Sequence, residues 1–159
     1  MTAMAAAKEQ FPRRRLTAVA AILIAGLLTV LLTRPAETAV SFTPLSGLMT
    51  LKATAAEAVP YEVAIANPKP TLIEFYADWC TTCQAMSPTV AALHQQYAER
   101  LNFVMLDVDR PQWASQVSDY GASGVPQFTL LDSEQQVVKT WVGKVPKAVF
   151  KTVFDQILG

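Results

Sequence analysis

The stretch FYADWCTTC at residues 75–83 says more about the fold than any other part of the chain. It joins an apolar run to Cys80 and Cys83, the only two cysteines among the 159 residues. Closing so small a ring removes little chain entropy from the unfolded state, so stabilisation is a weak reason for the pair. The spacing favours a reversible dithiol/disulfide couple instead.

A second interpretation of the cysteine pair is half of a zinc site. Such a site needs two further sulfur or imidazole ligands. The chain has no other cysteine, and its single histidine, His94, lies in a helical pattern next to Gln95 and Gln96, where a surface position is expected. We therefore predict no metal at the pair.

Hydrophobic residues follow two different periods on either side of the pair. Residues 71–76 and 102–108 form short apolar, β-branched runs that are typical of buried strands. Residues 80–101 between them carry apolar side chains at helical spacing. The order strand, helix, strand predicts a right-handed parallel crossover.

The second half of the chain predicts the rest of an α/β fold. A short helix is expected over residues 111–120, and the runs 127–131 and 137–142 are close enough to form an antiparallel hairpin. Residues 146–158 place apolar side chains on one helical stripe. Together these elements predict a mixed central sheet flanked by helices.

The position of the pair in this pattern predicts its chemistry. If the first strand ends near Ala77, Cys80 falls at the N-terminus of the next helix, where unpaired N–H groups and the helix dipole favour a thiolate. A lowered thiol pKa makes Cys80 the exposed nucleophile. Cys83 lies one turn further in, where it can attack a mixed disulfide but is too deep to be attacked first.

An uncharged apolar segment precedes this domain. Residues 16–33 would span roughly 27 Å as a helix, close to the hydrocarbon thickness of a bilayer, about 30 Å. The basic cluster at 13–15 predicts a cytoplasmic or stromal N-terminus, with the rest of the chain exported to a periplasm or thylakoid lumen. A cleaved signal peptide and a buried helix stay open as alternatives.

The expected organisation is therefore a basic N-terminus over 1–15, a transmembrane anchor over 16–33, a linker over 34–50 and a folded domain over 51–159. Charge divides along the same line. Residues 1–34 carry five basic side chains and one acidic one, whereas the remainder carries eight basic and twelve acidic. A mildly acidic domain with scattered lysines argues against nucleic acid as a partner.

Several motifs together resemble one family. The stretch 75–83, Pro88, the tripeptide Gly124-Val125-Pro126 and the dipeptide Val142-Gly143 are similar to the motifs of thioredoxin folds, over about residues 55–159. With the predicted anchor, the chain most resembles the membrane-anchored thioredoxin-like proteins of photosynthetic membranes, the TxlA type of thiol:disulfide interchange protein.

The resemblance implies a role for each matching residue. Cys80 attacks, Cys83 resolves, and Trp79 shapes the surface on which substrates dock. Pro126 is expected in the cis form opposite the cysteines, so that the backbone of Val125 is offered to an extended substrate segment.

Glu74 matches a buried acid that the family keeps beneath the resolving cysteine. Burial should raise its pKa enough for it to accept a proton from Cys83, the alternative being a surface glutamate. Met105 stands where a lysine often pairs with this acid, and Thr81-Thr82 replaces a glycine-proline pair and is expected to tune the potential. Three further carboxylates are expected to be solvated, namely those of Asp78, Asp107 and Asp109.

The resemblance implies a monomeric protein-disulfide reductase with no cofactor beyond its own disulfide. Its substrates would be oxidised proteins, such as apocytochromes or photosynthetic assembly factors. Its electrons would come from a membrane thiol carrier of the CcdA or DsbD type. Two alternatives stay open: an oxidase or isomerase that uses the same cysteines, and a non-catalytic assembly or holdase protein.

Overall fold

The computed structural model describes residues 44–159. A four-stranded mixed sheet lies at its centre, with strand order β2-β1-β3-β4. The strands are β1 (Thr71–Tyr76), β2 (Asn102–Asp107), β3 (Gln127–Leu131) and β4 (Val137–Val142). β1 pairs in parallel with β2 and antiparallel with β3, and β3 pairs antiparallel with β4. The predicted crossover and hairpin are confirmed.

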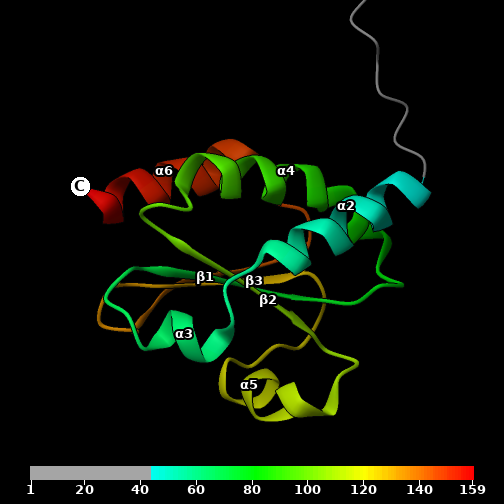
Figure 1. The fold of residues 1–159 in the computed structure, drawn as a ribbon, viewed down its shortest axis with the longest axis horizontal. Helices are drawn as coiled ribbons and strands as arrows, with labels where there is room; N and C mark the ends of the chain where they lie inside the picture. The colour runs from blue at the N-terminus through cyan, green and yellow to red at the C-terminus, as the bar shows by residue number, and fades with distance from the viewer. Residues whose placement is uncertain (1–43) are drawn as a thin grey trace, which may run out of the picture. The chain divides into compact units, whose positions relative to one another are not determined.

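Helices cover both faces of the sheet (Figure 1). α2 (Pro44–Glu57), α4 (Thr81–Tyr97) and α6 (Lys147–Leu158) form one layer, and α3 (Tyr61–Ile65) and α5 (Ala114–Asp119) lie on the other side. A 3-10 turn, η1 (Pro111–Trp113), leads into α5. The predicted helices near 111–120 and 146–158 are both present.

β1 is buried along its whole length, and its side chains alternate between the two layers. Ile73 and Phe75 pack into the cluster beneath α3 and α5, whereas Leu72 packs with Phe150 beneath α4 and α6. Alternation along a strand places Glu74, like Leu72, on the α4 side. The acidic side chain therefore lies in the same layer as the cysteine-bearing helix.

The structure corrects the expected linker. Residues 44–50, assigned to the linker over 34–50, form the first half of α2. Proline is tolerated in the first turn of a helix, and Gly47 permits close packing, because a Cβ added there would lie 2.9 Å from the carbonyl oxygen of Gln84 on α4. Gly47 therefore lies at a contact between α2 and α4 and not in a flexible linker.

No helix was expected over residues 61–65, where the structure has α3 with Pro60 as its N-cap. Val149, expected on the buried stripe of the last helix, is 39% exposed. Within residues 44–159 no helix is long and apolar enough to span a bilayer, and the anchor predicted over 16–33 lies outside the described residues.

The close approach at Gly47 predicts that an alanine there destabilises the protein, opposite to the usual effect of alanine in a helix. Replacing glycine by alanine inside a helix normally stabilises it by up to about 1 kcal/mol. Gly47→Ala should instead lower the free energy of unfolding by roughly 1 kcal/mol or more, because overpacking costs about 1–3 kcal/mol. Urea denaturation measures the change.

Gly124→Ala provides the matched control, since its added Cβ would lie 3.7 Å from Val142 Cγ1, an ordinary contact distance. It should change stability far less than Gly47→Ala. A Gly47→Ala variant more stable than the parent would contradict the close packing of α2 on α4.

Candidate active site

Cys80 occupies the junction between the central strand and α4. β1 ends at Tyr76, three residues turn the chain, and Cys80 is the N-cap of α4. Its Sγ accepts a hydrogen bond from the backbone N–H of Cys83 at 3.0 Å, and the two cysteines form a disulfide. In the reduced protein the unpaired N–H groups and the helix dipole stabilise a thiolate at this position.

The two sulfur-bearing residues differ in access. The Cys80 residue is 5% exposed, whereas Cys83 is fully buried. Cys80 was expected to be exposed, but in the disulfide form it is almost covered, because it packs in one cluster with Leu51, Tyr76, Ala77 and Cys83. The order of access still agrees with attack by Cys80 and resolution by Cys83.

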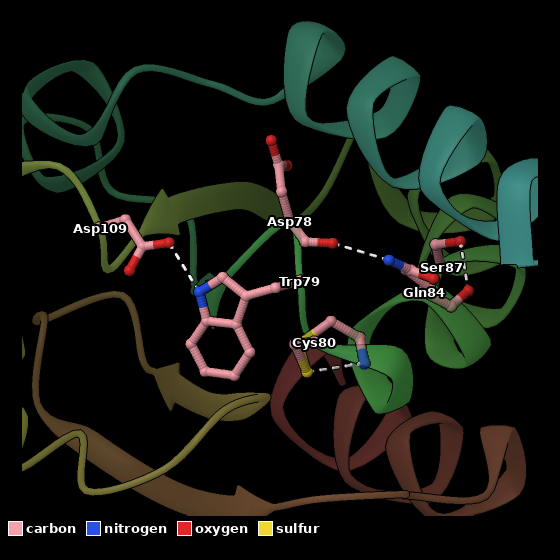
Figure 2. Close-up of a disulfide and its surroundings, with 7 residues drawn as sticks. Asp78, Trp79, Cys80, Gln84, Ser87 and Asp109 are labelled. Carbon is pink, nitrogen blue, oxygen red and sulfur yellow. Dashed lines mark hydrogen bonds between the residues drawn. A yellow bond between two sulfur atoms is a disulfide. The ribbon is translucent and has the colours of Figure 1, made fainter.

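The loop before Cys80 is held from both sides (Figure 2). The indole N–H of Trp79 donates to Asp109 Oδ2 at 2.8 Å, although the Trp79 residue is 66% exposed. The backbone carbonyl of Asp78 accepts from Gln84 Nε2 at 2.7 Å. These contacts hold an exposed aromatic ring next to the disulfide.

The three carboxylates expected to be solvated are in fact partnered. Asp109 binds the Trp79 indole. Lys52 Nζ donates to Asp78 Oδ2 at 2.6 Å, and Arg110 Nε lies 3.4 Å from Asp107 Oδ2. These partners do not exclude water, because Asp109 is exposed and Asp78 and Asp107 are partly exposed.

An open groove of about 300 Å³ lies beside Trp79. Its walls are mainly apolar and include Val117, Ala122, Gly124 and Val125. The Val125-Pro126 bond is cis, as expected, and Val125 packs against the cluster that contains both cysteines. The structure thus brings together Trp79, Val125 and the disulfide at one surface.

Glu74 is buried, with 1% of its surface exposed, so the alternative of a surface glutamate is wrong. Neither carboxylate oxygen has a hydrogen-bond partner within the described residues, and desolvation raises the pKa of Glu74 from 4.5 to about 8. Its register partners are Met105 on β2 and Phe128 on β3, neither of which carries charge. A group with this pKa has both protonation states within reach near neutral pH.

Thr81, Thr82 and His94, which the sequence analysis also singled out, all lie on α4. Thr81 is exposed and Thr82 half-buried in the first turn of α4. His94 is less exposed than expected, with a 14% exposed side chain and its ring centroid 5.1 Å from that of Phe103. Within residues 44–159 no three His, Cys, Asp or Glu side chains come together in a way that could hold a metal ion.

Sequence reasoning missed the part that α2 plays in the site. Leu51 is fully buried in the cysteine cluster, and Lys52 binds Asp78. A signal was present, since Gly47, Leu51 and Thr54 are all buried and follow the helical period of four and three residues. The stripe is hard to recognise in the sequence, because only Leu51 of its three members is a large apolar residue.

The chemistry that these groups support in common is thiol–disulfide exchange, so the chain is by class a protein-disulfide oxidoreductase. A family model named Thioredoxin matches residues 50–156. The chain belongs to the thioredoxin family.

Individual relatives agree with this assignment. The chain is 42% identical over 145 residues to a thiol:disulfide interchange protein, TxlA, from Synechococcus elongatus, covering 91% of this chain and 71% of that protein. It is 46% identical over 104 residues to the chloroplastic thioredoxin-like protein HCF164 of Oryza sativa, covering 65% of this chain but only 40% of the rice protein. A mutant thioredoxin from Halobacterium salinarum superposes with a TM-score of 0.54 at 28% identity, covering 64% of this chain and 88% of that one.

Burial of Glu74 makes stability depend on pH in a defined direction. The folded state binds this proton more tightly than the unfolded chain, so the stabilisation is complete below about pH 4.5 and is lost as the pH rises through about 8. Glu74→Gln lacks this titration. Over that window the stability of the oxidised parent should therefore fall relative to the variant by about 1.4 kcal/mol per pH unit.

Urea denaturation of both oxidised proteins across this pH range measures the difference. A constant offset between them is expected from the buried amide and carries no information, whereas the slope does. Glu62→Gln, at an exposed position of α3, keeps Glu74 and should therefore follow the same pH profile as the parent. Parallel pH profiles for Glu74→Gln and the parent would show that Glu74 is not a buried acid of raised pKa.

Proposed function

We propose that the protein is a membrane-anchored reductant that transfers two electrons from Cys80 and Cys83 to disulfides of exported or lumenal proteins. The observation that carries the proposal is the cysteine pair at the start of α4, placed beside the apolar groove under Trp79. An extended polypeptide segment fits such a groove, because its backbone can pair with that of Val125.

The exchange proceeds in two displacements. The Cys80 thiolate attacks one sulfur of the substrate disulfide, that S–S bond breaks, and the first substrate thiolate leaves. Cys83 then gives its proton to the Glu74 carboxylate and attacks Cys80 Sγ. The mixed disulfide breaks, the second substrate thiolate leaves and takes up a proton, and the Cys80–Cys83 disulfide forms as the substrate is reduced.

Each residue around the pair has a proposed part in this sequence. Trp79 and Val125 bind the substrate segment, and Pro126 sets the backbone that presents Val125. Thr81 and Thr82 separate the two cysteines and tune the potential of the couple, because groups at the first turn of α4 act directly on the thiolate.

The N-terminal segment supports the proposed compartment, and the electron donor is proposed from the resemblance. The similarity to the Synechococcus protein runs over 145 residues, more than residues 44–159 alone contain, so it extends into the region of the anchor expected over 16–33. We place the domain on the periplasmic or thylakoid-lumen side, where a membrane thiol carrier of the CcdA or DsbD type returns the electrons. The chloroplastic name of the rice relative supports a photosynthetic setting. We propose cytochromes or photosynthetic assembly factors as the clients.

A reductase must have a suitably low reduction potential. Equilibration of the full-length chain with glutathione buffers should give a value below about −150 mV. The oxidised and reduced fractions are read from alkylated protein. A higher value would favour an oxidase or isomerase and would defeat the proposed direction of electron flow.

Client proteins can be captured at the intermediate stage. Cys83→Ser removes the resolving thiol, so mixed disulfides on Cys80 should accumulate and be released by dithiothreitol. The double variant Cys80→Ser/Cys83→Ser is the control and should capture none. Equal recovery with both variants, together with full function of the double variant in cells, would support a non-catalytic assembly or holdase protein instead.

A further inference from the structure

Helix α2 is part of the surroundings of the disulfide, not merely the start of the domain. Ser87 Oγ on α4 donates to the carbonyl oxygen of Gly47 on α2 at 3.0 Å, and this contact is buried. Leu51, one helical turn further along α2, is fully buried among the residues around Cys80 and Cys83. The helix is therefore held firmly against the first turns of α4.

Lys52 extends this contact to the loop that carries Cys80. Its Nζ donates to Asp78 Oδ2 at 2.6 Å, with side-chain exposures of 58% for Lys52 and 43% for Asp78. The Asp78 carbonyl is bound by Gln84 Nε2, and the other carboxylate oxygen of Asp78, Oδ1, is buried with no partner within the described residues. Asp78 is thus held at both its main chain and its side chain, two residues before the attacking cysteine, and Figure 2 shows the main-chain contact with Gln84.

Few other charges lie near the pair. β3 carries no titratable side chain, and apart from Cys83 itself α4 carries none before His94. The charged and titratable groups on the other elements nearby are Lys52 on α2, Glu74 and Tyr76 on β1, Asp78 in the loop, and Asp107, Asp109 and Arg110 at the end of β2. Of these, Asp78 is nearest to Cys80 in the chain, and Lys52 is the cation bound to it.

We propose that Lys52 is a further positioning residue of the redox centre, which acts through Asp78 to hold the loop before Cys80 and to compensate the carboxylate charge two residues before the attacking cysteine. The proposal rests on thiol–disulfide exchange at the cysteine pair and is independent of the direction of electron flow and of the membrane anchor.

The consequence for the thiolate has a definite sign. Only two residues of chain separate Asp78 from Cys80, so their Cα atoms lie at most about 7 Å apart, and at an ionic strength of 0.01 M the Debye length is about 30 Å. An uncompensated Asp78 carboxylate would destabilise the Cys80 thiolate, whereas an uncompensated Lys52 ammonium would stabilise it. Removing either partner breaks the same ion pair but should move the reactivity of Cys80 in opposite directions.

The test compares Lys52→Met, Asp78→Asn and the double variant in the reduced full-length chain. Alkylation of Cys80 by iodoacetamide is followed against pH at low ionic strength. Lys52→Met should raise the apparent thiol pKa and slow alkylation at neutral pH about twofold, and Asp78→Asn should lower the pKa and speed it by a similar factor. The double variant should return close to the parent, and added salt should reduce both shifts.

Two control variants separate charge compensation from general effects. Lys52→Arg keeps the charge and should keep the parental pH profile. Lys69→Met removes an exposed lysine just before β1, at the end of the strand away from Cys80, and should leave the profile unchanged. Shifts of Lys52→Met and Asp78→Asn in the same direction, or no shift in either, would overturn the proposal, and so would an effect of Lys69→Met equal to that of Lys52→Met.

Discussion

The position of Cys80 as the cap of α4 is the constraint on which the site depends. Its sulfur accepts the Cys83 N–H that would otherwise lack a partner at the helix start. This geometry needs the preceding strand to end at Tyr76 and the loop to turn within three residues. β1 can fix that endpoint because it is buried on both faces and paired with a strand on each side.

Burial of β1 also places an acidic side chain in an unfavourable environment. Placing Glu74 in the same layer as the cysteine helix removes its carboxylate from water without supplying a cation, and the raised pKa is the result. The neighbouring Met105 maintains that condition by offering no charge in register. An acid whose charged form is costly is suited to the proton transfer proposed for Glu74, because burial leaves both of its protonation states accessible near neutral pH.

The site is assembled from three directions around a short loop. The end of β2 supplies Asp109 to hold Trp79, α4 supplies Gln84, and α2 supplies Lys52 and Leu51. Along the chain, α2 is the first described element after the N-terminal segment, and it is also in contact with the redox centre. The membrane attachment proposed for this protein would therefore begin at a helix that touches the active site.

Local sequence determined much of this structure. The alternation of strand and helix periods around residues 75–83 predicts the crossover, the hairpin and the last helix, because hydrophobic periodicity reflects which face of each element is buried. The position of Cys80 at a helix start follows from the same pattern, and the cis bond at Pro126 and the burial of Glu74 followed from the resemblance to thioredoxins. All of these are visible within one element or one motif.

Tertiary structure decided the contacts between elements. Lys52 and Asp78 are 26 residues apart, and Trp79 and Asp109 are 30 apart, so no local pattern could pair them. Gly47 illustrates the same limit, since a glycine read alone indicates a flexible tether, and only the surface of α4 shows that it allows two helices to approach. The sequence by itself determined that Cys80 and Cys83 form a redox couple, whereas packing decided which charges surround it, because electrostatic partners are chosen by distance in space and not along the chain.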